Sequence, residues 1–434
     1  MKQKLAELNN WTEIFLGDEK YFQLATGGTP STEKKEYWED GTIPWLSSGE
    51  VHKKVVRQAD GRITEKGFRN SNARFYPVNS TLIALAGQGK TRGTVAITEI
   101  EVTSNQSIAA IIPDERLIEP RYLYYNLDSR YEELRAISAG AGRAGLSLSI
   151  LANVSLKLPR KDEQEKIAII LSRIDQAIEQ TEALIAKQQR IKAGLMHDLL
   201  TKGIDEHGNI RSEATHEFKD SPLGRIPVEW DTPQIEDKLA KIIDYRGKTP
   251  NKADHGIPLI TAKIIRLGYL LEPDEFIPPE TYAKWMTRGL PAKDDVLFTT
   301  EAPLGNVAQI TNSKVALGQR VLTLQSEPDL KSDFLFYLLL YPSVRAQFDR
   351  ASSGSTVTGI KQSQFRLIRI LLPQTIEEQE RIVEILKTQD LCVQQESVNL
   401  SKLRALKTGL MQDLLTGKIP VTPLLETQPQ YTQA

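Results

Sequence analysis

The longest regular pattern of apolar and polar positions in this chain lies between residues 163 and 200. Proline is absent there, and apolar residues recur at steps of three, four or seven. These positions are Ile167, Leu171, Ile174, Ile178 and Ile185. Such a stripe is typical of a long helix that packs along one face, as in coiled coils. At 1.5 Å per residue, the stretch predicts a rod of about 57 Å.

The same pattern returns 215 residues later in the chain. Residues 163–167 read Glu-Gln-Glu-Lys-Ile, and residues 378–382 read Glu-Gln-Glu-Arg-Ile. Residues 194–201 match residues 409–416 at seven of eight positions, and a Leu-Pro pair precedes each block. An ungapped match of this kind indicates an internal repeat. We therefore predict two long helices of equal length.

The sequence leaves two arrangements of these helices open. Each helix could pack only on its own globular unit. Alternatively, the two helices could pair with each other in antiparallel orientation and hold two globular units apart. Equal length and mutual similarity favour the pair, because antiparallel partners of equal length bury both apolar stripes completely.

A less similar segment of roughly 155 residues precedes each helix, with scattered matches such as Thr29-Pro30 to Thr249-Pro250. Short β-rich runs punctuated by Gly and Pro predict a twisted sheet with loops in both segments. The runs are 81–85, 93–98, 108–112, 296–300 and 321–324. In each segment a helix follows, at about 120–136 and 330–350, and then a Gly-rich loop, at 138–145 and 352–359.

The predicted fold class is α+β, with two similar globular α+β domains and two long antiparallel coiled-coil-like helices, related by a pseudo-twofold internal repeat. We expect the first domain at 1–158 and the second at 204–372. The helical regions are expected at 159–203 and 373–419, followed by a flexible tail at 420–434.

Charge is unevenly distributed, although 55 Lys and Arg against 56 Asp and Glu give a total of −1. Residues 53–92 hold nine bases and two acids, a local charge of +7. Residues 343–371 hold five bases and one acid, a local charge of +4. Because clustered positive charge attracts phosphate, both stretches favour contact with a nucleic acid.

The loops near these stretches carry side chains that can bond to phosphates and base edges. In the first domain the DNA-binding candidates are Lys53, Lys54, Arg57, Arg74, Gln88, Lys90, Thr91, Arg92, Asn105, Gln106 and Arg143. In the second domain they are Gln319, Arg320, Thr358, Lys361, Gln362 and Ser363. Each of them could equally be an ordinary polar surface group.

Motifs for catalysis are missing from the sequence. Residues 84–91 are similar to a phosphate-binding loop, but such a loop must open a helix, and residues 92–98 read as a strand. The five His residues lack metal-ligand spacing, and the Asn/Asp-Pro-Pro-Tyr motif of adenine methyltransferases is absent. We therefore expect no catalytic residues, no metal site and no cofactor.

Composition limits the class of protein further. A chain of 434 residues with 40% hydrophobic and 26% charged residues is typical of two to four globular domains. The single cysteine, Cys392, excludes a disulfide framework. No apolar run reaches the ~18 residues of a membrane span, and the N-terminus lacks a signal-peptide core. We expect a soluble cytoplasmic protein without a membrane partner.

Together these motifs resemble the specificity (S) subunit of type I restriction-modification systems. The resemblance rests on the Leu-Pro pairs, the repeated Glu-Gln-Glu blocks and the repeated Gly-Leu-Met at 194–196 and 409–411. Residues 221–230, Ser-Pro-Leu-Gly-Arg-Ile-Pro-Val-Glu-Trp, are similar to that family's lead-in to its second recognition domain. The resemblance covers nearly the whole chain.

The resemblance implies a non-catalytic, sequence-specific DNA-binding subunit. Each α+β unit would be a target recognition domain for one half of an asymmetric, bipartite target in double-stranded DNA. The helices would set the distance between the half-sites and dock two methyltransferase (M) subunits, with restriction (R) subunits in the full complex. The implied subunit-interface residues are Glu163, Gln164, Ile167, Leu171, Met196, Leu199, Gln379, Ile382, Leu386, Met411 and Leu414.

Two other functions stay open at the level of sequence. The chain could be a standalone DNA methyltransferase or nuclease of unrecognised type, against which the missing motifs argue. It could also be a two-domain scaffold that binds only proteins.

Overall fold

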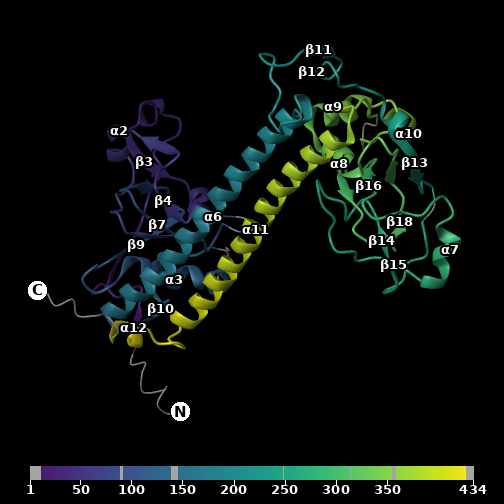
Figure 1. Cartoon of the computed structure of the whole chain (residues 1–434). Helices are drawn as coiled ribbons and strands as arrows, with labels where there is room; N and C mark the ends of the chain where they lie inside the picture. Colours follow the sequence, from purple (N-terminus) through teal and green to yellow (C-terminus); the bar gives the residue numbers. More distant parts are fainter. Residues whose placement is uncertain are drawn as a thin grey trace, which may run out of the picture. The chain divides into compact units, whose positions relative to one another are not determined.

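The computed structural model describes residues 11–87, 91–137, 145–247, 249–312, 314–353 and 358–426 (Figure 1). The chain forms two compact units. Unit 1 comprises Met1–Glu182 and Val398–Ala434, and unit 2 comprises Ala183–Ser397. Each unit holds one α+β domain together with part of both long helices, α6 (Lys161–Thr201) and α11 (Ile376–Leu414).

Unit 1 is built on two sheets. The larger has five strands in the order β2-β9-β6-β7-β4, and the smaller has three in the order β5-β3-β8. The larger sheet comprises β2 (Phe22–Thr26), β9 (Ile108–Pro113), β6 (Thr81–Ala84), β7 (Val95–Thr98) and β4 (Val55–Val56). The smaller comprises β5 (Gly61–Ile63), β3 (Ile43–Leu46) and β8 (Thr103–Ser104). β6 is buried along its whole length, so both faces of the larger sheet are covered there.

Unit 2 repeats this topology in its described residues, except that its larger sheet has four strands and no match to β4. Its larger sheet has the order β13-β19-β16-β17, and its smaller sheet has the order β15-β14-β18. The larger sheet comprises β13 (Leu239–Asp244), β19 (Val321–Ser326), β16 (Val296–Thr299) and β17 (Val307–Gln309). The smaller comprises β15 (Phe276–Ile277), β14 (Ile257–Ile260) and β18 (Ala316–Leu317). In both units the smaller sheet joins one antiparallel and one parallel neighbour to its central strand. The predicted internal repeat is therefore present in the fold.

The helix expected after each sheet is divided into two. In unit 1, α3 (Pro120–Ser129) and α4 (Tyr131–Ile137) meet at Arg130. In unit 2, α8 (Ser332–Leu340) and α9 (Pro342–Ala351) meet at Tyr341. Pro342 explains the second break, because proline cannot donate a helical hydrogen bond and pushes the preceding residue into an extended conformation. Tyr341 has that conformation, with φ −72° and ψ 132°.

The remaining elements are short and connect these layers. Two strand pairs are antiparallel, β1 (Thr12–Phe15) with β10 (Ser155–Leu158) and β11 (Phe218–Ser221) with β12 (Gly224–Pro227). The short helices are α2 (Glu65–Arg69), α5 (Leu148–Ala152), α7 (Tyr282–Trp285), α10 (Gln362–Phe365) and α12 (Thr422–Glu426). Turns of 3₁₀ helix are η1 (Lys35–Tyr37), η2 (Ser48–Lys53), η3 (Ile235–Lys238) and η4 (Pro279–Thr281).

The ends of the long helices belong to the domain cores. In unit 1, Ile167 and Leu171 near the start of α6 share a buried cluster with Leu414 at the end of α11. In unit 2, Ile382 and Leu386 near the start of α11 share a cluster with Leu199 at the end of α6. Each domain thus packs on the beginning of one long helix and the end of the other.

Contacts within each unit also show the helices side by side (Figure 1). In unit 1, the Asp175 carboxylate lies 2.6 Å from the Lys407 ammonium, and the Glu182 carboxylate lies 2.6 Å from Arg404. In unit 2, Gln389 donates to the side chain of Gln188 over 2.8 Å. As the residue numbers along α6 increase, the residue numbers of the partners on α11 decrease. This order confirms that the two helices are antiparallel. Packing of each helix on its own unit alone was the wrong alternative.

Candidate nucleic-acid interface

Three loops of unit 2 meet around one cavity of about 370 Å³. The first follows β13, the second joins β16 to β17, and the third lies between β18 and β19. Residues after α9 complete the lining. We call this group the unit 2 loop cluster, and its lining residues are Arg246, Gly247, Thr300, Glu301, Gln319, Arg320, Ser353, Gly359, Ile360 and Lys361.

Backbone hydrogen bonds fix these loops to one another. The amide of Thr300 donates to the carbonyl of Arg320 over 3.0 Å, and the amide of Ile360 donates to the carbonyl of Thr300 over 2.9 Å. Ser353 and Gly359 exchange amide-to-carbonyl bonds of 2.9 and 3.2 Å. The side chains of the cluster therefore project from a bonded frame and not from independent loops.

Unit 1 contains the same frame in the corresponding loops. The amide of Leu85 donates to the carbonyl of Ser107 over 2.8 Å, and that of Leu146 donates to the carbonyl of Leu85 over 3.0 Å. Gln106 accepts a 2.7 Å bond from the Thr29 hydroxyl. In unit 2, Gln319 donates a 3.1 Å bond to the Thr249 hydroxyl. The two units therefore present corresponding loops on a shared backbone arrangement.

The structure brings several predicted DNA-binding residues together. Gln319, Arg320 and Lys361 line the unit 2 cavity, and Thr358, Gln362 and Ser363 flank it in the chain. In unit 1, Asn105 and Gln106 occupy the corresponding loop, and Arg74 is exposed. Gln88, Lys90 and Arg143 lie outside the described residues.

Other predicted residues of unit 1 surround a separate cavity of about 660 Å³. Lys54 and Thr91 line it together with His52, Tyr131 and Arg135. Lys54 has a left-handed backbone conformation, with φ +64°. Arg92 is half-buried, and its Nε lacks a hydrogen-bond partner among the described residues.

Five of the nine bases in residues 53–92 are paired with carboxylates in the fold. Lys53 is paired with Glu50 and Asp60, and the hydrogen bond to Asp60 raises the pKa of its ammonium group. Arg57 donates to Glu99 over 2.9 Å, and this bond raises the pKa of the guanidinium. Three further bases also have carboxylate partners: Lys54 with Asp128, Lys66 with Glu36 and Arg69 with Glu65. Most of the partner acids lie outside the stretch, so the field at this surface is weaker than the local count of +7 indicates.

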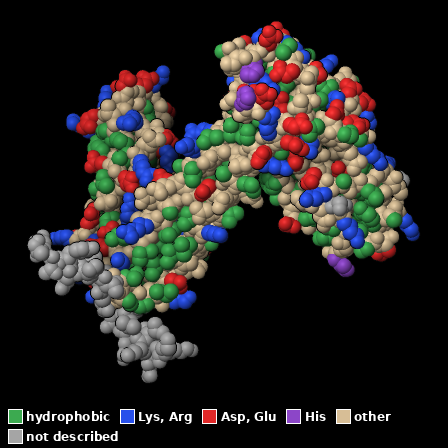
Figure 2. Space-filling view, viewed as in Figure 1, with side chains coloured by type: hydrophobic (Ala, Val, Ile, Leu, Met, Phe, Trp, Pro, Cys, Tyr) green, Lys and Arg blue, Asp and Glu red, His purple; other side chains and the backbone are tan. Residues whose placement is uncertain are grey.

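Among three arginines of the second basic stretch, one has a carboxylate partner and two donate to backbone carbonyls. Arg366 is paired with Glu236 at 2.6 Å, and Arg369 donates to the backbone carbonyl of Thr232. Arg345 donates to the carbonyl of Gly305, and burial lowers the pKa of its guanidinium. Figure 2 shows acidic and basic side chains interspersed over the visible face of both units. Charge alone therefore does not mark the interface.

Several residues of the loop frame were missed by sequence reasoning. Thr29 and Thr249 were noted only as repeat matches, yet each bonds the glutamine of its own unit. Arg246 and Glu301 lie far from Arg320 in sequence but line the same cavity. Comparison of the two repeats position by position would have found the threonines, but no sequence signal marks Glu301.

The described part of the chain was searched for metal sites and for membrane-spanning helices. There, no group of three or more His, Cys, Asp or Glu side chains is placed to hold a metal ion. None of the helices described is both long enough and apolar enough to span a bilayer.

The predicted subunit-interface residues lie mainly inside the chain's own cores. All of them are buried except Met411, which is half-buried. Gln164 accepts from the amide of Glu119 over 2.8 Å and donates to the carbonyl of Pro159 over 3.0 Å. Gln379 accepts from the amide of Lys331 and donates to the carbonyl of Asp329, both over 2.9 Å. The repeated glutamine thus fastens each long helix to its domain, and docking of other subunits through these positions stays a prediction.

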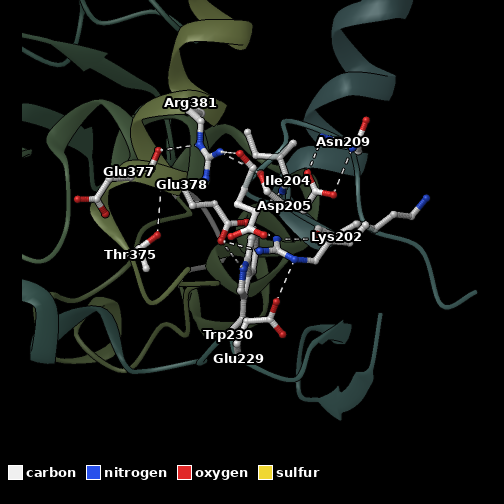
Figure 3. A network of polar contacts seen from close by, with 12 residues as sticks. Lys202, Ile204, Asp205, Asn209, Glu229, Trp230, Thr375, Glu377, Glu378 and Arg381 are labelled. Carbon is white, nitrogen blue, oxygen red and sulfur yellow. Dashed lines mark hydrogen bonds and ion pairs between the residues drawn. The ribbon is translucent and has the colours of Figure 1, made fainter. Parts of the chain in front are cut away.

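The repeated Glu378 anchors the connection that leads from α6 to the second domain (Figure 3). Its carboxylate pairs with Arg211 and accepts from the amide of Ile204 over 3.1 Å and from Trp230 Nε1 over 3.4 Å. Burial opposes the charge of Arg211, but the bond to Glu378 raises the pKa of the guanidinium overall. A Cβ atom at Gly203, where φ is +66°, would lie 2.2 Å from the Glu378 carboxylate, so the site requires glycine.

A second repeated feature was not found from the sequence. In unit 1, the Tyr125 hydroxyl donates to Asp175 over 2.8 Å, and Lys407 pairs with the same carboxylate. In unit 2, the Tyr337 hydroxyl donates to Asp390 over 2.8 Å, and Lys192 pairs with that carboxylate. We call these groups the Tyr-Asp-Lys triads; they are Tyr125-Asp175-Lys407 and Tyr337-Asp390-Lys192. Each triad joins a domain to both long helices.

Comparison with known proteins assigns the chain to a family. Residues 9–188 and 227–403 match the family model for the type I restriction modification DNA specificity domain. The MjaVIII specificity subunit of Methanocaldococcus jannaschii is 26% identical over 427 residues, covering 96% of this chain and 94% of that protein. The EcoR124I/EcoR124II specificity subunit of Escherichia coli is 31% identical over 154 residues, covering 34% and 37%.

Solved structures show the same fold. The S subunit of a type I restriction-modification system from M. genitalium superposes with a TM-score of 0.59 at 18% identity, covering 94% of this chain and 96% of that one. A chain from a type I R-M system gives a TM-score of 0.54 at 15% identity, covering 94% and 98%. The relatives are named specificity subunits, the non-catalytic components of such systems. The chain belongs to the type I restriction-modification DNA specificity family.

Proposed function

We propose that this chain reads an asymmetric, bipartite sequence in double-stranded DNA and positions a methyltransferase on it. Each unit would be a target recognition domain for one half-site. The long helices would set the spacing and dock two M subunits, through which R subunits join the full complex. The predicted cytoplasmic location belongs to the same proposal.

The observation that carries this proposal is a shared loop frame with unlike side chains. The bond from Leu85 to Ser107 in unit 1 corresponds to the bond from Thr300 to Arg320 in unit 2. The backbone therefore presents equivalent positions, while the chemistry differs from serine to arginine. Readers that share a frame but differ in side chains recognise unlike half-sites, whereas identical readers would recognise a palindrome.

Exposed apolar side chains on the long helices support the docking of other subunits. Ile191 on α6 and Leu406 on α11 occupy corresponding positions of the repeat and are 40% and 50% exposed. Leu391 on α11 is 64% exposed. Figure 2 shows hydrophobic side chains gathered along the part of the long helices that belongs to unit 1. A contiguous exposed apolar patch, unlike scattered surface leucines, is typical of a surface that binds another protein.

The proposal is tested by reconstituting the chain with the M subunits of its own system. Methylated positions are mapped in DNA, and binding is measured on duplexes in which one half-site at a time is scrambled. We expect a split motif and a loss of affinity with either scrambled half. The logarithm of the association constant should fall linearly with the logarithm of the salt concentration, because phosphate contacts release counterions. Equal binding to intact and fully scrambled duplexes would refute sequence recognition.

The same material separates the two alternatives. A standalone methyltransferase would transfer radiolabel from S-adenosylmethionine to DNA without partner subunits, whereas we expect transfer only in the reconstituted complex. A protein-only scaffold would bind the M subunits but contribute no sequence preference to the complex.

A further inference from the structure

One ion pair in the unit 2 loop cluster joins two positions whose matches in unit 1 carry no charge. Arg320 Nε lies 2.9 Å from a Glu301 carboxylate oxygen. The side chains of Arg320 and Glu301 are 53% and 38% exposed, so both reach solvent at the mouth of the cavity. By the backbone bonds described above, Arg320 corresponds to Ser107 and Glu301 follows Thr300 as Ala86 follows Leu85. Neither Ala86 nor Ser107 carries a charge.

The backbone holds both residues in place. Arg320 has φ +68°, a left-handed conformation that is costly for a residue with a side chain. Its carbonyl is fixed by the amide of Thr300, and Glu301 forms an antiparallel bridge with Gly359. A Cβ atom at Gly359 would lie 3.1 Å from the Glu301 Cβ, so the two segments approach closely. Strain of this kind, retained at a surface cavity, indicates that the side-chain position has a use.

A carboxylate is unfavourable in a cleft that faces phosphates, because like charges repel. The contact with Arg320 explains why the Glu301 carboxylate is present in this cleft. The Glu301 carboxylate contacts the guanidinium at Nε, so this ion pair does not occupy Nη1 and Nη2, which can serve as a pair of donors. Two parallel donors match O6 and N7 of guanine in the major groove, which is the commonest specific contact between proteins and DNA.

We propose that Arg320 reads a guanine in the half-site of unit 2 and that Glu301 is the positioning residue for its guanidinium. This inference rests on the proposed function and adds the base and the residues that read it. Lys361 and Arg246, which line the same cavity, are the phosphate contacts beside this reader. Because unit 1 has alanine and serine at the matching positions, this Arg-Glu reader belongs to the unit 2 half-site only.

The test uses the full chain in complex with its M subunits and a DNA library randomised at each half-site. Methylation is scored for each base at each position, for wild type and for R320K, R320G, E301Q and E301A. R320K keeps the charge but loses the fork of donors, and R320G removes the side chain while relieving the left-handed backbone. R366K, in the exposed pair with Glu236, is the matched control in the same domain.

We expect wild type to prefer guanine at one position of the unit 2 half-site. R320K and R320G should reduce that preference by about 5- to 150-fold, the range measured for a bidentate contact, with the other half-site unchanged. E301A should weaken the same preference at the same position, and E301Q, which still offers an oxygen to Nε, should restore part of it. R366K should leave the preference unaltered.

Three outcomes would overturn the inference. Arg320 variants could retain the guanine preference, or lower methylation of all sequences equally, as loss of a phosphate contact would. Glu301 variants could change the preference at a different position, which would make Glu301 a reader of cytosine or adenine instead. In each case a wild-type split motif would leave the proposed function standing, whereas absence of any preference in the unit 2 half-site would refute both.

Discussion

The buried ion pair between Arg211 and Glu378 gives the sharpest prediction about stability. Arg211 is 8% exposed and Glu378 is 4% exposed. Arg211 Nη2 lies 3.1 Å from one carboxylate oxygen, and Nε also contacts Glu229 at 2.9 Å. The substitution R211M removes the charge but keeps most of the volume of the side chain. It leaves the Glu378 carboxylate buried with only neutral donors.

Loss of one partner from a buried ion pair costs about 3–5 kcal/mol, because the remaining charge is uncompensated. The amide of Ile204 and the indole of Trp230 still donate to Glu378, so we expect the lower end, about 3 kcal/mol. E378M should cost less, because Arg211 keeps the carboxylate of Glu229 as a partner. The double variant R211M/E378M should cost less than the sum, by about 2 kcal/mol, because it buries no lone charge.

Urea titration with hydrogen exchange detected by mass spectrometry measures this effect in the first turns of α11. The matched control is R225M on the same connection, because Arg225 pairs with Glu213 at 2.9 Å while 49% and 61% of their side chains are exposed. Removal of that pair should cost less than about 1 kcal/mol. Equal losses for R211M and R225M, or strict additivity in the double variant, would refute the assignment of Glu378 as a buried anchor.

Three further predictions concern the long helices and unit 1. D390N should leave Tyr337 and Lys192 without their shared carboxylate. We expect urea denaturation to show a free energy of unfolding of unit 2 that is lower by about 1–3 kcal/mol, with no change in unit 1. A heptad inserted into both long helices should lengthen the gap of the methylated motif by about three base pairs. A heptad inserted into only one helix should abolish methylation. An unchanged gap would contradict the spacer role. Burial raises the pKa of Glu99, but bonds from Arg121 and Arg57 lower it overall. The ionised Glu99 should therefore stabilise the fold above pH ~4.5, and this stabilisation should be lost as the pH falls. In thermal unfolding, E99Q should abolish this part of the pH dependence of stability.

Repetition made much of the fold predictable. Gln164 and Gln379 are conspicuous as repeated polar residues at helix starts, and the structure explains the repetition by equivalent bonds to each domain. Buried polar groups need specific partners, so both copies retain the same residue. The strands at 81–84, 108–113 and 321–326 were similarly predictable, because buried strands leave short apolar runs.

The candidate site was less predictable, because its charges come from separate parts of the chain. Arg57 looked free for phosphate, but its carboxylate partners are 42 and 122 residues away in sequence. Arg320 and Glu301 became a pair only when two loops were fixed by hydrogen bonds between their backbones. Counting charge within a window of sequence measures composition, whereas the field at a surface depends on pairing across the fold.

The Tyr-Asp-Lys triads explain why the two helices repeat at one constant offset. Each helix carries an aspartate and, seventeen residues later, a lysine: Asp175 with Lys192 on α6, and Asp390 with Lys407 on α11. Because the helices are antiparallel, the lysine of each meets the aspartate of the other, at points about 26 Å apart along each helix. A shift of one helix by a single turn would break both ion pairs. Each unit therefore holds one ion pair that favours a single register of the part of the two helices it contains.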